Sequence, residues 1–271
     1  MTNAIVTTGG AAALTPEQIA LMQGDSHTSD FNARDLTVPY IRIVQSTSGY
    51  MKRNDSDYIA DAKEGDILDT LTLTLRQRAA FIPSKYEQTF AEWKPNMGPL
   101  VRQWGTDRSA YDAAAPQTEG FEAGTHVTAE GNLIVPAATY YGLLLDESGT
   151  SMPVILAFTG TQAKKSRKMA TLVSSLQMSG ANGESFTAPM WSRIYQLNTV
   201  PESNEKGSWS GWGINPGPLT LTVPGGAGLF AKAKKLREDV EAGLLKPAAQ
   251  AERTPSSAAA SGGVDPDSIP F

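Results

Sequence analysis

Four cationic side chains fall within five residues, at Lys164, Lys165, Arg167 and Lys168. The apolar spacing of segment 161–178 predicts a helix, so the four cations lie near its beginning. The helix dipole disfavours cations at that end, and an anionic partner would offset this cost. The cluster therefore indicates a phosphate-binding site, while a solvated helix end remains the alternative.

A second candidate site is formed by Trp191, Arg193 and Tyr195, which alternate along a strand predicted over 187–200. The period of two residues in a strand places all three on one face. Aromatic faces for stacking and a cation for phosphate are what hold single-stranded nucleic acid. We therefore predict DNA binding here, with burial of the two aromatic residues in the core as the alternative.

Further cations lie on or beside predicted strands near two aromatic residues, and two tryptophans lie in a glycine-rich segment that a base could approach closely. These additional DNA-binding candidates are Arg76, Arg78, Lys85, Trp209 and Trp212. For each tryptophan, a place in the core is the competing interpretation.

The C-terminal residues combine charge with an apolar end. Asp265 and Asp267 precede Ile269, Pro270 and Phe271, and a low-complexity segment rich in Ala, Ser, Pro and Gly comes before them. Phe271 can fill a pocket on another protein, and Pro270 limits the conformational entropy lost on binding. The acids and the terminal carboxylate can pair with basic groups. We therefore predict a partner-binding tip.

This ending resembles the C-terminal tip of the bacterial single-stranded DNA-binding protein (SSB) family, in which a flexible linker, an acidic run and Ile-Pro-Phe follow one another. Ser268 departs from that pattern, where an acid is usual. The resemblance implies that the tip recruits replication, recombination and repair enzymes while an oligonucleotide/oligosaccharide-binding (OB) domain holds the DNA.

The body resembles phage-encoded proteins regarded as single-stranded DNA-binding proteins. The similar stretches are VPYIRIVQ (38–45), AKEGDI (62–67) and FIPSKYEQTFAEWKP (81–95). This resemblance covers roughly residues 36–215. It implies a phage replication or recombination protein in the cytoplasm of the bacterial host. Its partners would be single-stranded DNA and host or phage enzymes.

Enzymatic alternatives find less support in the sequence. Glu92 and Lys94 have the E-x-K form of restriction-type nucleases, with Asp66 or Asp69 as a further acid, and hydrolysis of this kind needs converging carboxylates around a metal ion. The chain has no cysteine, which excludes a thiol nucleophile, and it has no P-loop. We expect a protein without enzymatic activity or cofactor. A magnesium-dependent nuclease and a recombination accessory protein that does not bind DNA are the alternatives.

The elements that position these residues are mainly strands. Alternating or β-rich patterns predict strands over 39–45, 70–76, 78–84, 86–93, 132–146, 152–158, 187–200, 208–214 and 218–223. Helices are predicted over 161–178 and 227–245. A short helix capped by Thr15 is the alternative to a frayed N-terminal arm. We expect a mainly β fold: an OB-like barrel with long loop insertions, a C-terminal helix and a disordered tail. A sandwich remains possible.

The charge distribution supports this division. The net charge is −5, but residues 36–237 carry +2 between acidic ends. We predict a flexible arm over 1–35, an OB-like DNA-binding domain over 36–245, a disordered linker over 246–264 and the tip over 265–271. Neither a signal peptide nor a membrane span is expected, and self-association stays open.

Overall fold

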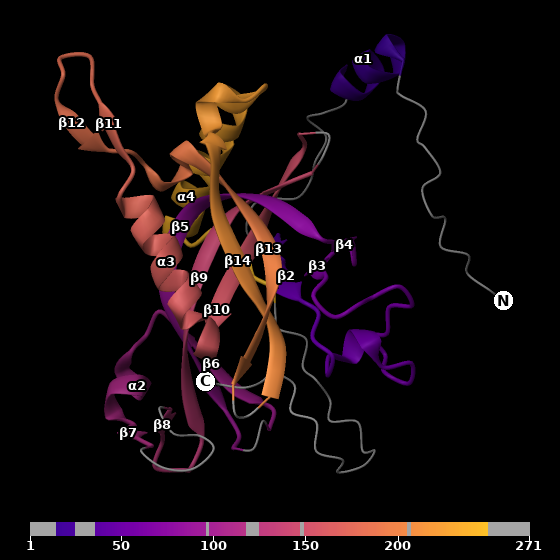
Figure 1. Cartoon of the computed structure of the whole chain (residues 1–271), viewed down its shortest axis with the longest axis vertical. Helices are drawn as coiled ribbons and strands as arrows, with labels where there is room; N and C mark the ends of the chain where they lie inside the picture. Colours follow the sequence, from indigo (N-terminus) through magenta and orange to yellow (C-terminus); the bar gives the residue numbers. More distant parts are fainter. Residues whose placement is uncertain are drawn as a thin grey trace.

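The computed structural model describes most of the chain (Figure 1). The described residues are 15–24, 36–95, 98–117, 125–146, 149–204 and 207–248. They form a mainly β structure with a few helices, which confirms the expected class.

The main sheet has 11 strands among the described residues. Eight of them form a continuous path in the order β14-β13-β5-β9-β10-β2-β3-β4. The strands on this path are β2 (Tyr40–Ile43), β3 (Ile67–Asp69), β4 (Leu75–Arg76), β5 (Arg78–Trp93), β9 (Leu133–Leu145), β10 (Ser151–Thr159), β13 (Arg193–Asn204) and β14 (Gly207–Leu219). An OB barrel has five strands. The mainly β class is thus confirmed, and the OB likeness is not.

The other strands are short, and α3 and α4 pack on the two faces of the sheet. These strands are β1 (Thr37–Val38), β6 (Leu100–Gly105), β7 (Ala115–Pro116), β8 (His126–Val127), β11 (Gln177–Ser179), β12 (Ser185–Thr187) and β15 (Lys246–Pro247). The helices are α1 (Pro16–Gly24), α2 (Ser109–Ala113), α3 (Ala163–Ser174) and α4 (Gly226–Glu241). Short 3₁₀ turns are η2 (Gly49–Met51), η3 (Gly160–Gln162), η4 (Met190–Ser192) and η5 (Thr220–Thr222).

The two strands predicted over 78–84 and 86–93 are one strand, β5, which runs through the middle of the sheet. Its register against β9 shifts between Pro83 and Lys85, where the strand has a bulge. Gly142 of β9 lies opposite, where an added Cβ would come 2.4 Å from the Ile82 carbonyl oxygen. Glycine is therefore required for the two strands to stay in contact across the bulge.

Three sequence predictions of local structure were wrong. Residues 70–74 form a turn, because the Asp69 carboxylate accepts hydrogen bonds from the Leu71 and Thr72 amides and the Thr72 hydroxyl. Residues 220–222 form the turn η5 instead of a strand. The linker predicted from residue 246 begins too early, since β15 pairs in parallel with β1.

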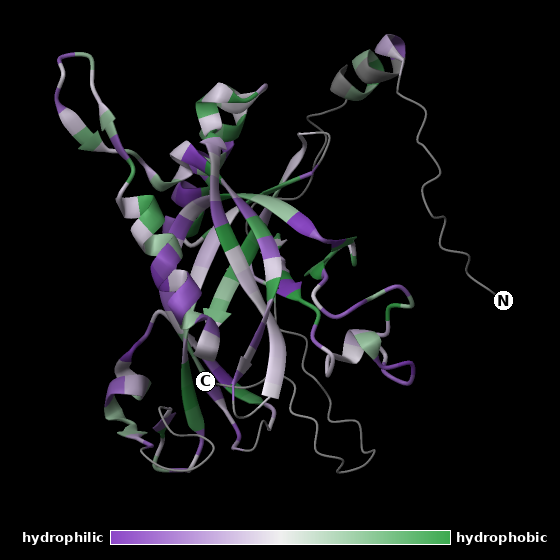
Figure 2. Cartoon of the chain, viewed as in Figure 1, coloured by the Kyte–Doolittle hydropathy of each residue, from purple (hydrophilic) through white to green (hydrophobic). Residues whose placement is uncertain are grey.

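The sheet is apolar on both faces, and each face packs against a helix. One face, the α3 side, carries Phe81, Tyr140, Leu156 and Leu197, against which Met169 of α3 packs. The opposite face, the α4 side, packs against α4 through Leu229, Ala233, Leu236 and Val240, which are three or four residues apart in the sequence. Figure 2 shows apolar residues concentrated on the strands and hydrophilic residues in the first half of α3.

The sheet curls until β14 meets the chain that follows β2. The Gln45 side chain donates from Nε2 to the Ser210 carbonyl oxygen (2.8 Å) and accepts from the Ser210 amide at Oε1 (2.9 Å). Thr199 of β13 also donates to the carbonyl oxygen of Gly65 (2.7 Å). A buried amide side chain thus takes the place of a neighbouring strand, which gives the sheet its half-barrel shape.

Between β5 and β9, residues 98–117 and 125–132 form a small lobe on the ends of these two strands. Its strands β6 and β8 pair with β5 and β9, and α2 packs Tyr111 against Phe90 of β5. His126 stacks on Tyr111 with ring centroids 3.8 Å apart. The described residues of this segment therefore extend the sheet and share a small apolar cluster with it.

Candidate nucleic-acid interface

Helix α3 carries the densest cationic cluster, and its orientation is fixed by two buried residues. Met169 is fully buried in the core, and the Ser166 carbonyl oxygen accepts a hydrogen bond from the Tyr140 hydroxyl (3.2 Å). Positions 164, 167, 168 and 171 consequently face outward. The helix predicted over 161–178 is confirmed, although it ends at Ser174.

The four cations of this helix divide into two pairs. Lys165 forms an ion pair with Glu202 of β13 (Nζ to Oε1, 2.6 Å), and Lys168 donates to the Ile214 carbonyl oxygen (2.9 Å). Lys164 and Arg167 are exposed and have no ion pair within the described part of the chain. These two side chains are therefore the members of the cluster that remain available to an anion.

Glu202 is the centre of a polar cluster between α3 and β14. Its Oε2 accepts from Gln162 Nε2 (2.9 Å) and from Trp209 Nε1 (3.0 Å). Partial burial raises the pKa of Glu202, but the hydrogen bonds from Lys165, Gln162 and Trp209 outweigh burial and hold this pKa below its ordinary value. The carboxylate stays ionised and anchors α3 to the sheet.

The exposed edge of β14 is covered by side chains. Beside the Gln45 bridge, Gln162 accepts from the Trp212 amide (3.0 Å) and Lys168 bonds to Ile214. Such side-chain partners block the edge-to-edge pairing to which open strands are prone. Lys168 and Gln162 thus serve the fold, whatever else they contact.

The predicted trio does not share one face. Trp191 lies in the turn η4, on the α4 side, where its ring contacts Phe230 (centroids 6.0 Å apart). Tyr195 lies on the α3 side and is only 1% exposed. Arg193 begins β13 between them, half-buried. The prediction of one shared face is wrong because the strand starts two residues after Trp191, and both rings are buried in the core.

The tryptophans of the glycine-rich segment are also held by the fold. Trp212 is buried in the core, and half-buried Trp209 donates to Glu202. An added Cβ on Gly211 would come 2.3 Å from the Glu202 carboxylate. The space that the glycine leaves is therefore filled by Glu202 and is not open to a base.

The remaining predicted cations are dispersed. Lys85 pairs with Glu241 of α4 (2.9 Å), and Arg78 is exposed where β5 meets β13. Arg76 lines a pocket of about 230 Å³ at the edge strand β4, with one Nη atom buried and without a partner among the described residues. The structure does not bring these three side chains together with α3.

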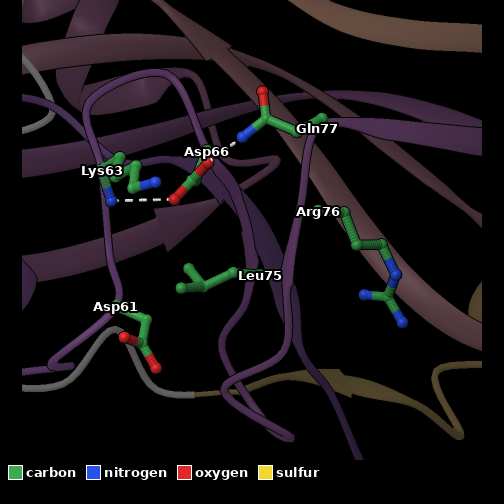
Figure 3. A pocket seen from close by; sticks show the side chains of 6 residues that line it. All are labelled: Asp61, Lys63, Asp66, Leu75, Arg76 and Gln77. Atoms are coloured by element: carbon green, nitrogen blue, oxygen red, sulfur yellow. Dashed lines mark hydrogen bonds between the residues drawn. The ribbon is translucent and has the colours of Figure 1, made fainter.

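The pocket beside Arg76 has a mixed lining, which Figure 3 shows in detail. Its residues are Asp61, Lys63, Asp66, Leu75, Arg76 and Gln77. Asp66 accepts hydrogen bonds from the Lys63 amide (2.8 Å) and from the Gln77 side chain, so it holds the loop to β4. Two carboxylates face two cations here, and the pocket therefore has no excess of charge to attract a phosphate.

The residues of the nuclease alternative are apart in the fold. Glu92 is buried and accepts from Asn132 Nδ2 (2.6 Å) and Trp104 Nε1 (3.1 Å). Glu92 lies beside Ile134 of β9, whereas Asp69 lies in the row of β2 and β10 residues that ends at Tyr140 of the same strand. Ile134 and Tyr140 are six residues apart, so the two acids are separated by roughly 20 Å along the sheet. Within the described ranges, no three His, Asp or Glu side chains gather where they could hold a metal ion.

The residues of the predicted tip, Asp265, Asp267, Ile269, Pro270 and Phe271, lie outside the described residues. One exposed feature was missed by the sequence reasoning: β11 and β12 form a hairpin beyond α3 with Met178 and Phe186 exposed. The Gly183 turn and the short polar strands that flank it could have indicated it. Among the described helices, none is long and apolar enough to cross a membrane.

A comparison with protein families relates this chain to phage proteins. A family described as Pam3 phage gp34-like protein matches residues 8–246. No curated protein and no solved structure matches the chain.

Proposed function

The chain belongs to the Pam3 phage gp34-like protein family, and we propose that it serves a phage as a single-stranded DNA-binding protein. The observation that carries this proposal is the pair of unpaired, outward-facing cations on α3, Lys164 and Arg167. They lie one helical turn apart on the same face, a spacing of about 5 Å that lets them contact neighbouring phosphates of one strand.

The anchoring of α3 supports this role. Lys165 and Lys168 are bound to the sheet, so the helix presents its two free cations from a fixed surface. A pre-positioned cation loses little conformational freedom when it meets a phosphate. Because the cations lie in the first turns of α3, where its dipole disfavours them, a bound phosphate would also relieve that cost.

The aromatic residues predicted to stack on bases are not free to do so. Trp191, Tyr195 and Trp212 belong to the core, which leaves phosphate contacts as the main source of affinity in the body. Binding of this kind depends little on sequence and strongly on salt. The tip residues Asp265, Asp267, Ile269, Pro270 and Phe271 would recruit host or phage replication and recombination enzymes to the coated strand, as the resemblance to the SSB tip implies.

The test is fluorescence anisotropy of the full chain with a single-stranded oligonucleotide, with the corresponding duplex in parallel. We expect tighter binding to the single strand and a loss of affinity in the double variant Lys164→Ala/Arg167→Ala. Two lost phosphate contacts correspond to about a 25-fold loss at 0.1 M salt, from the slope of about 0.7 per contact.

The matched control is Lys232→Ala/Lys234→Ala, which removes the same charge from exposed positions of α4. We expect it to bind as the wild type does. Absence of binding to the single strand, or equal binding to both DNA forms, would refute the proposal. Partner binding without any DNA binding would indicate the recombination accessory protein.

A further inference from the structure

The hairpin of β11 and β12 projects from the body at the end of α3 (Figure 1). Met178 and Phe186 are direct cross-strand partners, and both remain exposed, at 36% and 43%. On the other face, Gln177 donates to the Thr187 hydroxyl (2.8 Å) and accepts from Ser185 (3.4 Å). The hairpin therefore has one polar, internally bonded face and one apolar face in contact with solvent.

An isolated hairpin with exposed apolar side chains has a free-energy cost that a purely structural role does not explain. A two-stranded hairpin with no third strand is only marginally stable in water, and a pair of exposed large apolar side chains adds to the unfavourable hydration. The turn is nevertheless well defined. Glu184 accepts from the Asn182 amide (3.1 Å) and lies against Gly180, so its carboxylate is engaged in the turn.

The size of the apolar face indicates its partner. Two side chains offer far less area than the roughly 1,200 Å² that a specific protein interface buries, so a second protein or a second copy of this chain would gain little here. One aromatic ring with a thioether beside it does match a nucleobase, which stacks on a single aromatic side chain.

The position of the hairpin supports the same partner. Arg167 precedes the end of α3 by seven residues, about 10 Å along the helix axis, and the hairpin begins three residues after that end. This axial separation is short enough for a strand whose phosphates contact Lys164 and Arg167 to reach the hairpin.

We propose that the β11–β12 hairpin is a base-stacking finger, in which Phe186, supported by Met178, holds a nucleobase of the strand whose phosphates bind Lys164 and Arg167. This inference rests on the proposed function. It supplies the aromatic platform that the buried tryptophans do not provide.

The experiment separates bases from phosphates. Anisotropy is measured for wild type and Phe186→Ala with an oligo-dT and with an abasic oligonucleotide of equal length, which keeps the phosphates and lacks the bases. Loss of one stack corresponds to binding of oligo-dT weaker by at least about fivefold. Binding of the abasic strand should not change. Phe186→Trp should restore the affinity, and Ser179→Ala, on the polar face, should have no effect.

Each outcome decides between the claims. If both oligonucleotides bind and Phe186→Ala weakens neither or weakens both equally, the finger is refuted while the proposed function stands. If neither binds, the proposed function fails and the finger with it. If Phe186→Ala abolishes self-association in sedimentation velocity and leaves oligo-dT binding intact, the occupant is a second copy and the inference is wrong.

Discussion

Replacement of Gln45 by alanine tests how the sheet is closed. The Gln45 side chain is 4% exposed and makes two hydrogen bonds with the backbone of Ser210, at 2.8 and 2.9 Å. Gln45→Ala removes both bonds and leaves an amide and a carbonyl of β14 without protein partners. Gln45 and Ser210 are 165 positions apart in the sequence, so these bonds join distant parts of the domain. We therefore expect their loss to destabilise the whole domain and not only the loop around Gln45.

The expected loss of unfolding free energy follows from the two hydrogen bonds. Each is worth about 0.5–1.5 kcal/mol net, and an orphaned buried group costs about 1–3 kcal/mol. Since Ser210 is half-buried, water can replace part of the lost bonding. We therefore expect the free energy of unfolding to fall by about 2–3 kcal/mol, which for a domain of this size lowers Tm by roughly 4–12 °C.

Urea denaturation followed by tryptophan fluorescence measures this free energy. Gln88→Ala is the matched control, because Gln88 is exposed on β5 and the same side chain is removed. The control should stay within about 0.5 kcal/mol of the wild type. If Gln45→Ala is no less stable than the control, the side-chain bridge does not hold the sheet closed and the reasoning fails.

Two further predictions concern strain and charge. Leu73 has a positive φ of 54° and is 53% exposed, so Leu73→Asn, which tolerates this conformation, should raise the free energy of unfolding by about 0.5–1 kcal/mol; a decrease in urea denaturation would contradict the assigned strain. Glu202 has a lowered pKa in the folded state. Its contribution to stability is therefore complete above its ordinary pKa and is lost as the pH falls through the folded value. Wild type should exceed Glu202→Gln in stability near pH 7, and the difference should shrink below about pH 4.5; a difference independent of pH in thermal unfolding would contradict the ionised cluster.

The strands and helices with strong periodicity could be predicted from the sequence. The apolar spacing of α4 and the apolar runs of β9 and β10 are local features of the sequence, and both sets of apolar residues lie in the core. The turn at 70–74 could not be predicted, because its alternating Thr and Leu residues are typical of a strand. A single carboxylate, Asp69, decides the conformation instead.

The candidate site was harder to predict than the fold. The cluster on α3 was found from residue type and spacing, but its division into bound and free cations depends on Glu202 and Ile214, which are distant in the sequence. The prediction that Trp191, Arg193 and Tyr195 share one face was wrong because the strand begins later than predicted. Trp191 and Tyr195 therefore lie on opposite sides of the sheet. Contacts between residues far apart in the sequence decide which cations are free and which rings are buried. Local sequence patterns carry no information about such contacts.

The salt dependence of DNA binding tests the central claim most directly. The logarithm of the association constant for oligo-dT is measured against the logarithm of salt concentration for wild type and Lys164→Ala/Arg167→Ala. If both side chains contact phosphates, the slope of the double variant should be smaller in magnitude by about 1.4. Lys232→Ala/Lys234→Ala should keep the slope of the wild type. Equal slopes for wild type and the α3 variant would contradict the assignment of α3 as the phosphate-binding surface.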